Sequence, residues 1–214
     1  MTETRDSIVI VPLDPSPCLC ADDTCDDLGC VAPLPSWWTT ATTTNCPLVV
    51  DVEPGLTGFA GTVFAQAREC QNTTASSVID IDDDWVIDVH ITLTGTTPNL
   101  ICGLWCVSAC LESMCGPTYY RFPRDSDIDS PPSQYCCCLV ETNQFQSDYE
   151  IRICIPAGVV DESECGAPYE LTVIVTLLSR DQMKSGDICD PGTYMPLGIA
   201  TACELPLMTF YDGG

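Results

Sequence analysis

The residues of this chain with the greatest chemical potential are its cysteines. The 214-residue sequence contains 17 cysteines and a single histidine. Histidine is the usual companion of cysteine in zinc sites and in thiol catalysis, so its scarcity favours oxidation of the thiols to disulfides. Because 17 is odd, at least one thiol must stay free, bind something, or bond to another chain. The sequence therefore predicts disulfide cross-links and gives a first indication of assembly.

The candidates for cross-links between subunits or strands form an N-terminal group and a group in the middle of the chain. The first group, Cys18, Cys20, Cys25 and Cys30, has the pattern C-x-C-x4-C-x4-C among several aspartates. This pattern lacks the CxxC pairs typical of zinc ribbons, and neighbouring carboxylates disfavour thiolates, so we expect disulfides within this segment or across chains. The second group of cross-link candidates, within the chain or between subunits, is Cys102, Cys106, Cys110, Cys136, Cys137, Cys138 and Cys154.

Spacing restricts how the second group can pair. Cys102 and Cys106 lie roughly 13 Å apart along a strand, whereas bridged cysteines need Cα atoms within about 7 Å, so these two cannot bond to each other. Cys136 and Cys138 point to one face of an extended chain and Cys137 to the other. Two alternatives remain open for this triplet: each cysteine joins a different strand of its own domain, or one bonds an N-terminal cysteine of another copy.

Two groups of aspartates supply the oxygen ligands that Ca²⁺ prefers. Asp125, Asp127 and Asp129 occupy positions 1, 3 and 5 of an EF-hand-like loop. Ser130 and Cys136 replace the glycine and the glutamate that such a loop needs, so it is not an EF-hand. The second group, at an expected turn between strands, is Asp80, Asp82, Asp83 and Asp84. We favour a solvated acidic loop for each group, with a Ca²⁺ site as the alternative.

The remaining candidates for chemistry have simpler explanations. His90 lies beside Asp88 on the polar side of an alternating segment, so we expect an exposed or edge histidine. Without a second histidine, a G-x-S-x-G motif or a phosphate-binding glycine loop, catalysis would rest on carboxylates or Lys184, and we expect no enzyme and no small-molecule substrate. Trp37 and Trp38 are typical of packing between an arm and a sheet, with a carbohydrate or partner contact as the alternative.

Composition excludes several classes of partner. The chain has 31 acidic and 7 basic residues, a formal net charge of −24, which disfavours binding to nucleic acids and anionic lipids. No segment approaches the ~20 apolar residues of a membrane span, and the first residues lack the pattern of a secretory signal. Persistent disulfides nevertheless need an oxidising compartment. We therefore expect an extracellular or cell-surface location, reached by release or non-classical export.

The elements that must position these residues are strands preceded by an arm. Residues 1–46 are rich in Pro, Asp and Cys and include a β-prone run, Ser7, Ile8, Val9, Ile10 and Val11. They predict an extended N-terminal arm that acts as a donor strand or tether, because a segment of this length can span on the order of 150 Å. Residues 47–214 are expected to form the folded domain.

From residue 47 onward, short β-prone segments alternate with turn-forming residues. Residues 85–94 alternate between apolar and polar side chains, which predicts a half-buried strand. Further strands are expected at residues 48–52, 62–67, 78–81, 101–111, 135–141, 149–155, 169–178 and 206–211. Trp105 is expected in the core. In the absence of a helical stripe, this spacing favours an all-β fold, an antiparallel β-sandwich or jelly roll.

This layout, a cysteine-bearing N-terminal arm followed by a β-sandwich with thiols in its strands, resembles the subunits of disulfide-cross-linked bacterial endospore appendages. In that family an N-terminal connector bonds covalently to neighbouring subunits, and assembly precedes lysis of the mother cell. The resemblance implies that Cys18 and Cys20 on the arm bond Cys137 or Cys102 of another copy. It also implies a location on the spore surface. It covers the architecture and no diagnostic motif, and this chain is longer, more acidic and richer in cysteine than is usual for that family.

We therefore expect a structural subunit that assembles with itself into a disulfide-stabilised extracellular filament or surface appendage. Two other classes remain open. A Ca²⁺- or glycan-binding β-sandwich adhesin module would be a monomer with internally paired cysteines. A thiol-rich metal-binding protein would contain reduced cysteines with bound Zn²⁺ or Cu(I).

Overall fold

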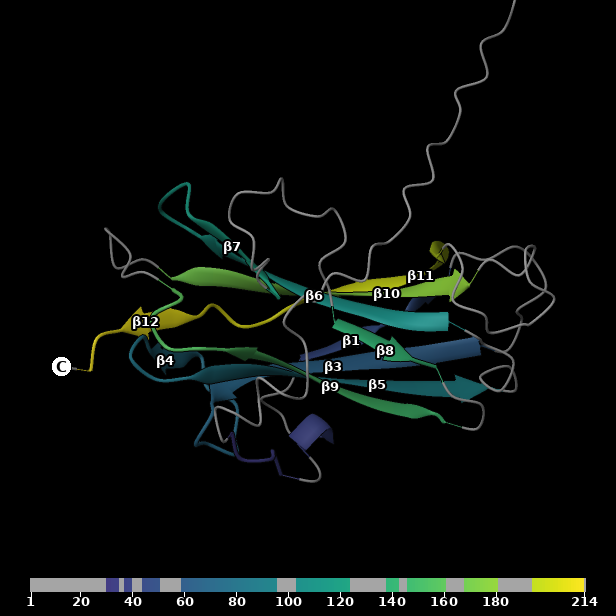
Figure 1. The fold of residues 1–214 in the computed structure, drawn as a ribbon, viewed down its shortest axis with the longest axis horizontal. Coiled ribbons are helices and arrows are strands. Elements are labelled where there is room, and N and C mark those ends of the chain that lie inside the picture. The colour runs from purple at the N-terminus through teal and green to yellow at the C-terminus, as the bar shows by residue number, and fades with distance from the viewer. Residues whose placement is uncertain are drawn as a thin grey trace, which may run out of the picture.

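A computed structural model shows that the chain folds into two stacked antiparallel sheets (Figure 1). The structure describes residues 30–34, 37–39, 44–50, 59–95, 103–123, 138–142, 146–160, 168–180 and 194–213. The expected donor strand at residues 7–11 and most of the expected arm lie outside these ranges. Within the described ranges, no helix is long and apolar enough to cross a membrane.

Sheet A, the lower layer in Figure 1, is built around β3 and β5. Its strands lie in the order β1-β3-β5-β9, and all neighbours are antiparallel. Their bounds are Thr44–Pro47, Phe59–Glu69, Trp85–Gly95 and Asp148–Ile155. Because β3 and β9 pair with its two edges, β5 is an interior strand of the sheet.

Sheet B, the upper layer in Figure 1, has the strand order β2-β11-β10-β6-β7. β8 also pairs with β6. The bounds of these strands are Val49–Val50, Tyr194–Glu204, Tyr169–Arg180, Gly103–Ser113, Tyr119–Phe122 and, for β8, Cys138–Glu141. β7 and β8 share one edge of β6, where β7 pairs with residues 109–112 and β8 with residues 104–107.

A small parallel pair of strands lies at one end of the sandwich, beside the C-terminus (Figure 1). It consists of β4 (Val78–Asp80) and β12 (Thr209–Tyr211). The ring of Phe210 lies 5.6 Å from Trp85 of β5 and 5.3 Å from Tyr169 of β10, measured between ring centroids. This pair of strands therefore packs against both sheets. A 3-10 helix, η1 (Trp37–Thr39), lies on the outside of sheet A.

Alternation along the central strands produces the core between the two sheets. Ile87 and Ile91 of β5 and Val175 of β10 are fully buried. Trp105 of β6 is also fully buried, with its ring 6.0 Å from that of Tyr149 on β9. The expected core position of Trp105 is confirmed. Each large apolar side chain buried in this way contributes about 1.5–3 kcal/mol to folding.

The expected all-β, antiparallel fold is confirmed, and each expected strand range overlaps an observed strand. The jelly-roll connectivity stays a prediction. Three observed strands, β1, β7 and β11, are not among those expected. β11 contains Pro196 and Gly198 and lacks a clear alternation, β7 is short, and β1 lies in the segment assigned to the arm. Tertiary pairing, rather than local pattern, determines these strands.

Candidate functional site

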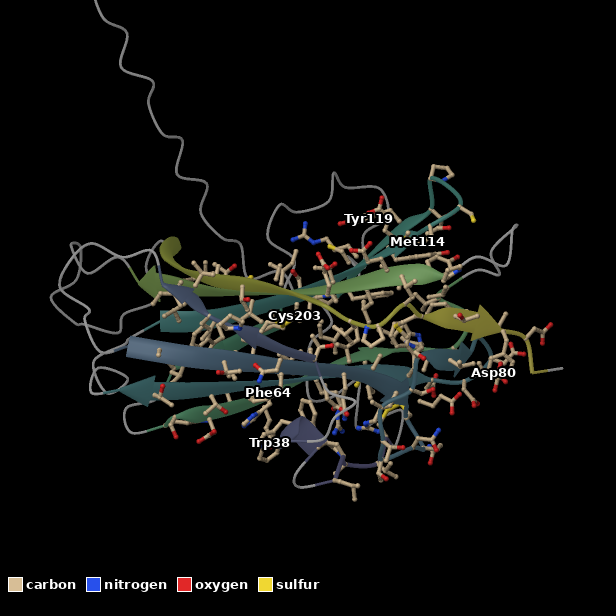
Figure 2. All side chains as sticks on the ribbon, turned by 180° about the vertical axis from the view of Figure 1, so that it is seen from behind. Trp38, Phe64, Asp80, Met114, Tyr119 and Cys203 are labelled. Carbon is tan, nitrogen blue, oxygen red and sulfur yellow. A yellow bond between two sulfur atoms is a disulfide. The ribbon has the colours of Figure 1, made fainter. Side chains whose placement is uncertain are left out.

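Two disulfides connect distant parts of the chain. Cys46 of β1 bonds Cys203 of β11 across a sequence separation of 157 residues, which links sheet A to sheet B. Cys203 is fully buried, and Figure 2 shows it between the two layers. Cys30 bonds Cys70, directly after β3, across a separation of 40 residues. Such links typically contribute about 2–4 kcal/mol each by restricting the unfolded chain. The expectation that cysteines form disulfides is confirmed for these four.

The structure also places several of the other candidate cysteines. Cys106 of β6 and Cys154 of β9 are disulfide-bonded. Cys138 begins β8, where its Cα pairs with that of Val107. Cys110 of β6 is a free and partly exposed thiol. The candidates that lie outside the described residues are Cys18, Cys20, Cys25, Cys102, Cys136 and Cys137.

Residues 30–34 and 37–39, here called the strap, lie against the outer face of sheet A, the face turned away from sheet B. The strap begins at the Cys30–Cys70 disulfide. The next residue, Val31, donates its backbone N–H to the carbonyl of Cys70 at 2.9 Å. Its own carbonyl accepts a hydrogen bond from Arg68 Nη2 at 2.9 Å. At the other end of the strap, Trp37 is only 3% exposed. The strap is therefore anchored at both ends.

The aromatic end of the strap covers His90 of β5. The Trp38 ring stacks on the imidazole with centroids 4.2 Å apart, and Trp37 meets it edge-on at 6.3 Å. Phe64 of β3 lies beside the same imidazole at 6.2 Å. Figure 2 shows Trp38 and Phe64 together on this side of the sandwich. The expected packing of Trp37 and Trp38 against a sheet is confirmed.

The expectation of an exposed or edge histidine is wrong. His90 is 2% exposed, and β5 lies between β3 and β9. The alternation of residues 85–94 does separate polar from apolar side chains, but the strap covers the polar face near His90. Asp88 on that face is 4% exposed. The prediction of a half-buried strand is therefore also wrong, because most of β5 is buried on both faces.

A buried cluster of charges lies beneath the disulfide end of the strap. Arg68 of β3 is fully buried, and its Nε donates to Asp88 Oδ2 at 2.6 Å. Its Nη1 donates to the carbonyl of Asn72 at 2.5 Å, and its Nη2 to that of Val31. Asp88 also accepts a hydrogen bond from Arg152 Nε on β9 at 2.8 Å. These partners offset the desolvation cost of burying the charges.

His90 sits at the border between this buried face and exposed carboxylates. Burial lowers its pKa below the ordinary histidine value, and the nearby charges of Asp148 and Glu150 oppose that shift. The imidazole Nε2 lies 3.5 Å from Asp148 Oδ1, and Nδ1 lies 3.3 Å from Thr92 Oγ1. The covered state therefore favours a neutral imidazole beneath Trp38.

The outer face of sheet B carries the free thiol of Cys110. Cys110 Sγ lies 3.0 Å from Tyr119 Oη, and this hydrogen bond is the main cause that raises the pKa of Tyr119. Arg121 of β7 is the cross-strand neighbour of Cys110. Its Nε is buried and has no hydrogen-bond partner among the described residues. Figure 2 shows Tyr119 and Met114 on the side of the sandwich opposite Trp38.

The acidic turn that follows β4 uses its carboxylates to hold backbone N–H groups. Asp80 Oδ1 accepts hydrogen bonds from the amides of Asp82 at 3.1 Å and Gly213 at 3.3 Å. Asp84 Oδ1 accepts one from the amide of Ala157 at 2.8 Å. In the described part of the chain, no three His, Cys, Asp or Glu side chains gather to hold a metal ion. The other candidate Ca²⁺ ligands, Asp125, Asp127 and Asp129, lie outside that part.

Sequence reasoning missed Arg68 and Cys70. A signal was present, because Arg68 is one of only 7 basic residues and lies two positions before a cysteine. Asp88 stands on the polar side of the most regular strand, so a cross-strand charge pair was a testable hypothesis. The partner strand and its register were needed to bring the two together.

No protein-family model matches the chain, and no curated protein is significantly similar to it. The geometry of the cysteines and of the two outer faces is therefore the basis for assigning a function.

Proposed function

We propose that this protein is a structural subunit, hardened by disulfides, that joins copies of itself into a filament or surface appendage outside the reducing cytosol. The observation that carries the proposal is the state of Cys110. It is a free, partly exposed thiol on the outer face of sheet B, whereas Cys30, Cys46, Cys70, Cys106, Cys154 and Cys203 are all bonded. An accessible thiol in a sandwich that also contains these six bonded cysteines is available for a bond to another chain.

The N-terminal residues supply the complementary thiols. The Cys30–Cys70 disulfide ties residue 30 to the end of β3. The residues before it include Cys18, Cys20 and Cys25. A fully extended segment of that length spans roughly 100 Å, which is enough to reach a neighbouring subunit. In the proposed assembly, residues 7–11 add a strand to a neighbour's sheet edge, and an N-terminal thiol bonds the neighbour's body. The resemblance of the sequence layout to that of endospore-appendage subunits favours the same arrangement.

The charge of the chain supports covalent rather than purely non-covalent association. A net charge of −24 makes copies repel one another at low ionic strength. Disulfides withstand this repulsion, whereas a weak interface between like-charged subunits does not. In the proposed role, the assembly resists mechanical and chemical stress. Oxidation of thiols to disulfides is the last step of assembly.

Electrophoresis without reductant tests the proposal directly. Purified, oxidised protein is expected to form an SDS-resistant ladder that collapses to a single band when a thiol reductant is added. A Cys110→Ser variant is expected to shorten or abolish the ladder. Cys115→Ser is the matched control, because Cys115 is an exposed cysteine near Cys110 in the β6–β7 hairpin.

Mass spectrometry of unreduced protein then decides between the proposal and its alternatives. Peptides that join Cys110 to Cys18, Cys20 or Cys25 of a different chain support the filament. Solitary chains in which every disulfide is internal refute it and favour a monomeric adhesin module. Solitary chains with reduced cysteines and stoichiometric Zn²⁺ or Cu(I) refute it and favour a metal-binding protein.

A further inference from the structure

We propose that Arg68, held by Asp88, is the positioning residue that selects Cys70 as the partner of Cys30. Seventeen cysteines allow very many pairings, and disulfide exchange by itself does not distinguish between them. A non-covalent contact that brings two cysteines together before oxidation makes one pairing dominant, because it raises their effective concentration. The hydrogen bonds of Arg68 supply such a contact within a single chain, whether or not copies assemble.

The first support is the distribution of the donors of Arg68. Its Nε is bound to Asp88 Oδ2, and Nη2 lies 3.5 Å from Asp88 Oδ1, which fixes the plane of the guanidinium. Nη2 also donates to the carbonyl of Val31, the residue after Cys30. Nη1 faces three carbonyls of the turn that carries Cys70, those of Glu69, Cys70 and Asn72, at 3.4, 3.4 and 2.5 Å. One side chain thus holds the backbone beside both cysteines.

The second support is that the strap is also held by non-covalent contacts that involve neither sulfur atom. The amide of Val31 donates to the carbonyl of Cys70 at 2.9 Å, so the two segments also pair through their backbones. The stacking of Trp38 on His90 and the burial of Trp37 fix the far end of the strap. The strap can therefore dock on sheet A while both cysteines are still thiols.

The third support is the cost of the arrangement. A buried ion pair is often no more stabilising than apolar residues of similar volume, because each charge loses its hydration. Arg68 is fully buried, and Asp88 nearly so. Val86 of β5 lies on the same face, directly opposite Arg68 of β3, and it is fully buried, so this face also accommodates an apolar side chain. A role in specificity explains why a charge pair is present there.

Oxidation then proceeds by thiol–disulfide exchange with a low-molecular-weight disulfide such as oxidised glutathione. The thiolate of one cysteine attacks the glutathione disulfide, forming a mixed disulfide and releasing one glutathione thiolate. The second cysteine, held nearby, loses its proton to solvent and attacks the protein sulfur of the mixed disulfide, which expels the second glutathione thiolate. Two protein thiols lose two electrons, and one glutathione disulfide gains them.

Refolding of the full chain under these conditions tests the proposal. Reduced wild type, Arg68→Gln and Arg152→Gln are refolded in a glutathione redox buffer, quenched with an alkylating agent, and digested without reduction to identify the partner of Cys30. Arg152→Gln is the matched control, because Arg152 binds the same carboxylate from β9 and, among the described residues, hydrogen-bonds no part of the strap. We expect Arg68→Gln to lower the ratio of Cys30–Cys70 to other Cys30 pairs about tenfold, equal to about 1.4 kcal/mol. Arg152→Gln is expected to leave the ratio close to that of wild type. Equal ratios in all three proteins, or equal losses in both variants, overturn the proposal.

A second measurement applies even where Arg68→Gln fails to fold. In a Cys30→Ser/Cys70→Ser variant that keeps Arg68, the Val31 amide is expected to remain protected from hydrogen exchange, because docking precedes the bond. Exchange of that amide at the rate of an unstructured peptide overturns the proposal, since the disulfide would then hold the strap rather than the strap directing the disulfide.

Discussion

The two sheets of the sandwich have similar inner faces and different outer faces. On the outer face of sheet A, Asp88 and His90 are 4% and 2% exposed, because the strap lies over them. On the outer face of sheet B, Ile174 is 37% exposed and Tyr119 is 55% exposed. Polar side chains are thus buried on one sheet while apolar ones are exposed on the other, the reverse of what residue type alone predicts.

This contrast shows that the chemistry of an outer face depends on what the rest of the chain places over it. The strap lies over sheet A and contacts its polar residues. Arg68 donates a hydrogen bond to the strap, and the imidazole of His90 stacks on Trp38. The described part of sheet B keeps a free thiol on its surface. The two faces therefore differ: sheet A anchors the strap, and sheet B carries Cys110, the thiol that the proposed function uses for a bond to another copy.

The contrast predicts that two arginines, one on each outer face, differ greatly in their contribution to stability. Arg68→Met removes one partner of a buried charge pair and is expected to cost about 3–5 kcal/mol, because Asp88 is left incompletely neutralised. Arg121→Met on sheet B is expected to cost less than about 1 kcal/mol, since Arg121 is partly exposed and its Nε is unpaired within the described residues. Chemical denaturation of both variants measures the difference. Similar losses would mean that the two faces are equivalent.

A pair of apolar truncations compares the two faces through packing alone. Trp37→Ala is expected to destabilise the protein by about 3 kcal/mol, because it removes a nearly buried indole from the strap. Ile174→Ala on the outer face of sheet B is expected to cost about 1 kcal/mol or less, because that side chain is already partly in water. Hydrogen exchange in Trp37→Ala should rise at strap amides and remain unchanged in β6 and β10. Uniform loss of protection would contradict a locally docked strap.

The strands with strong alternation could be predicted from the sequence, and the cover over sheet A could not. Residues 85–94 alternate regularly, and β5 forms there. The same alternation predicts a solvated polar face, since strand patterns record which side chains share a face and not what lies above that face. The cover comes from the strap, residues 30–34 and 37–39, and this stretch of sequence has no periodicity that indicates a docking partner.

The sequence predicted which types of residue form the candidate site, but it did not predict which of those residues contact or bond one another. The abundance of cysteine correctly indicates disulfides, and the expectation that Trp37 and Trp38 pack on a sheet is confirmed. Cys30 is one of many cysteines in the sequence. Its partner, Cys70, is a single cysteine after a strand, and nothing in the sequence around it indicates a partner. Pairing is a long-range property set by strand register and by Arg68, and neither can be read from local spacing.

The cover over sheet A is expected to respond to acid. Folding lowers the pKa of His90. The contribution of His90 to the free energy of unfolding is therefore constant at pH values well above about 6.5, the ordinary pKa of histidine. It falls as the pH drops from that value toward the lowered pKa, because the unfolded chain then binds more protons. A tenfold difference in proton affinity between the folded and unfolded states corresponds to about 1.4 kcal/mol. Denaturation between neutral and mildly acidic pH, compared with His90→Gln, isolates this contribution. A wild-type curve as flat as that of the variant contradicts it.

On sheet B the corresponding titration belongs to Tyr119, and its effect on stability is expected to be the smallest. The hydrogen bond with Cys110 raises the pKa of Tyr119. The stability that this shift contributes is therefore retained up to a pH of about 10, the ordinary pKa of tyrosine, and is lost as the pH rises through the raised pKa. Because Tyr119 is 55% exposed, solvent weakens this coupling. Cys110→Ala should return the pKa of Tyr119 toward its ordinary value while changing stability by less than about 0.5 kcal/mol. Ultraviolet titration of the phenolate measures the change. A Tyr119 titration that is unchanged in Cys110→Ala would show that the thiol and the phenol are not in contact in solution. It would also remove one reason to regard Cys110 as held in place on the surface proposed for assembly.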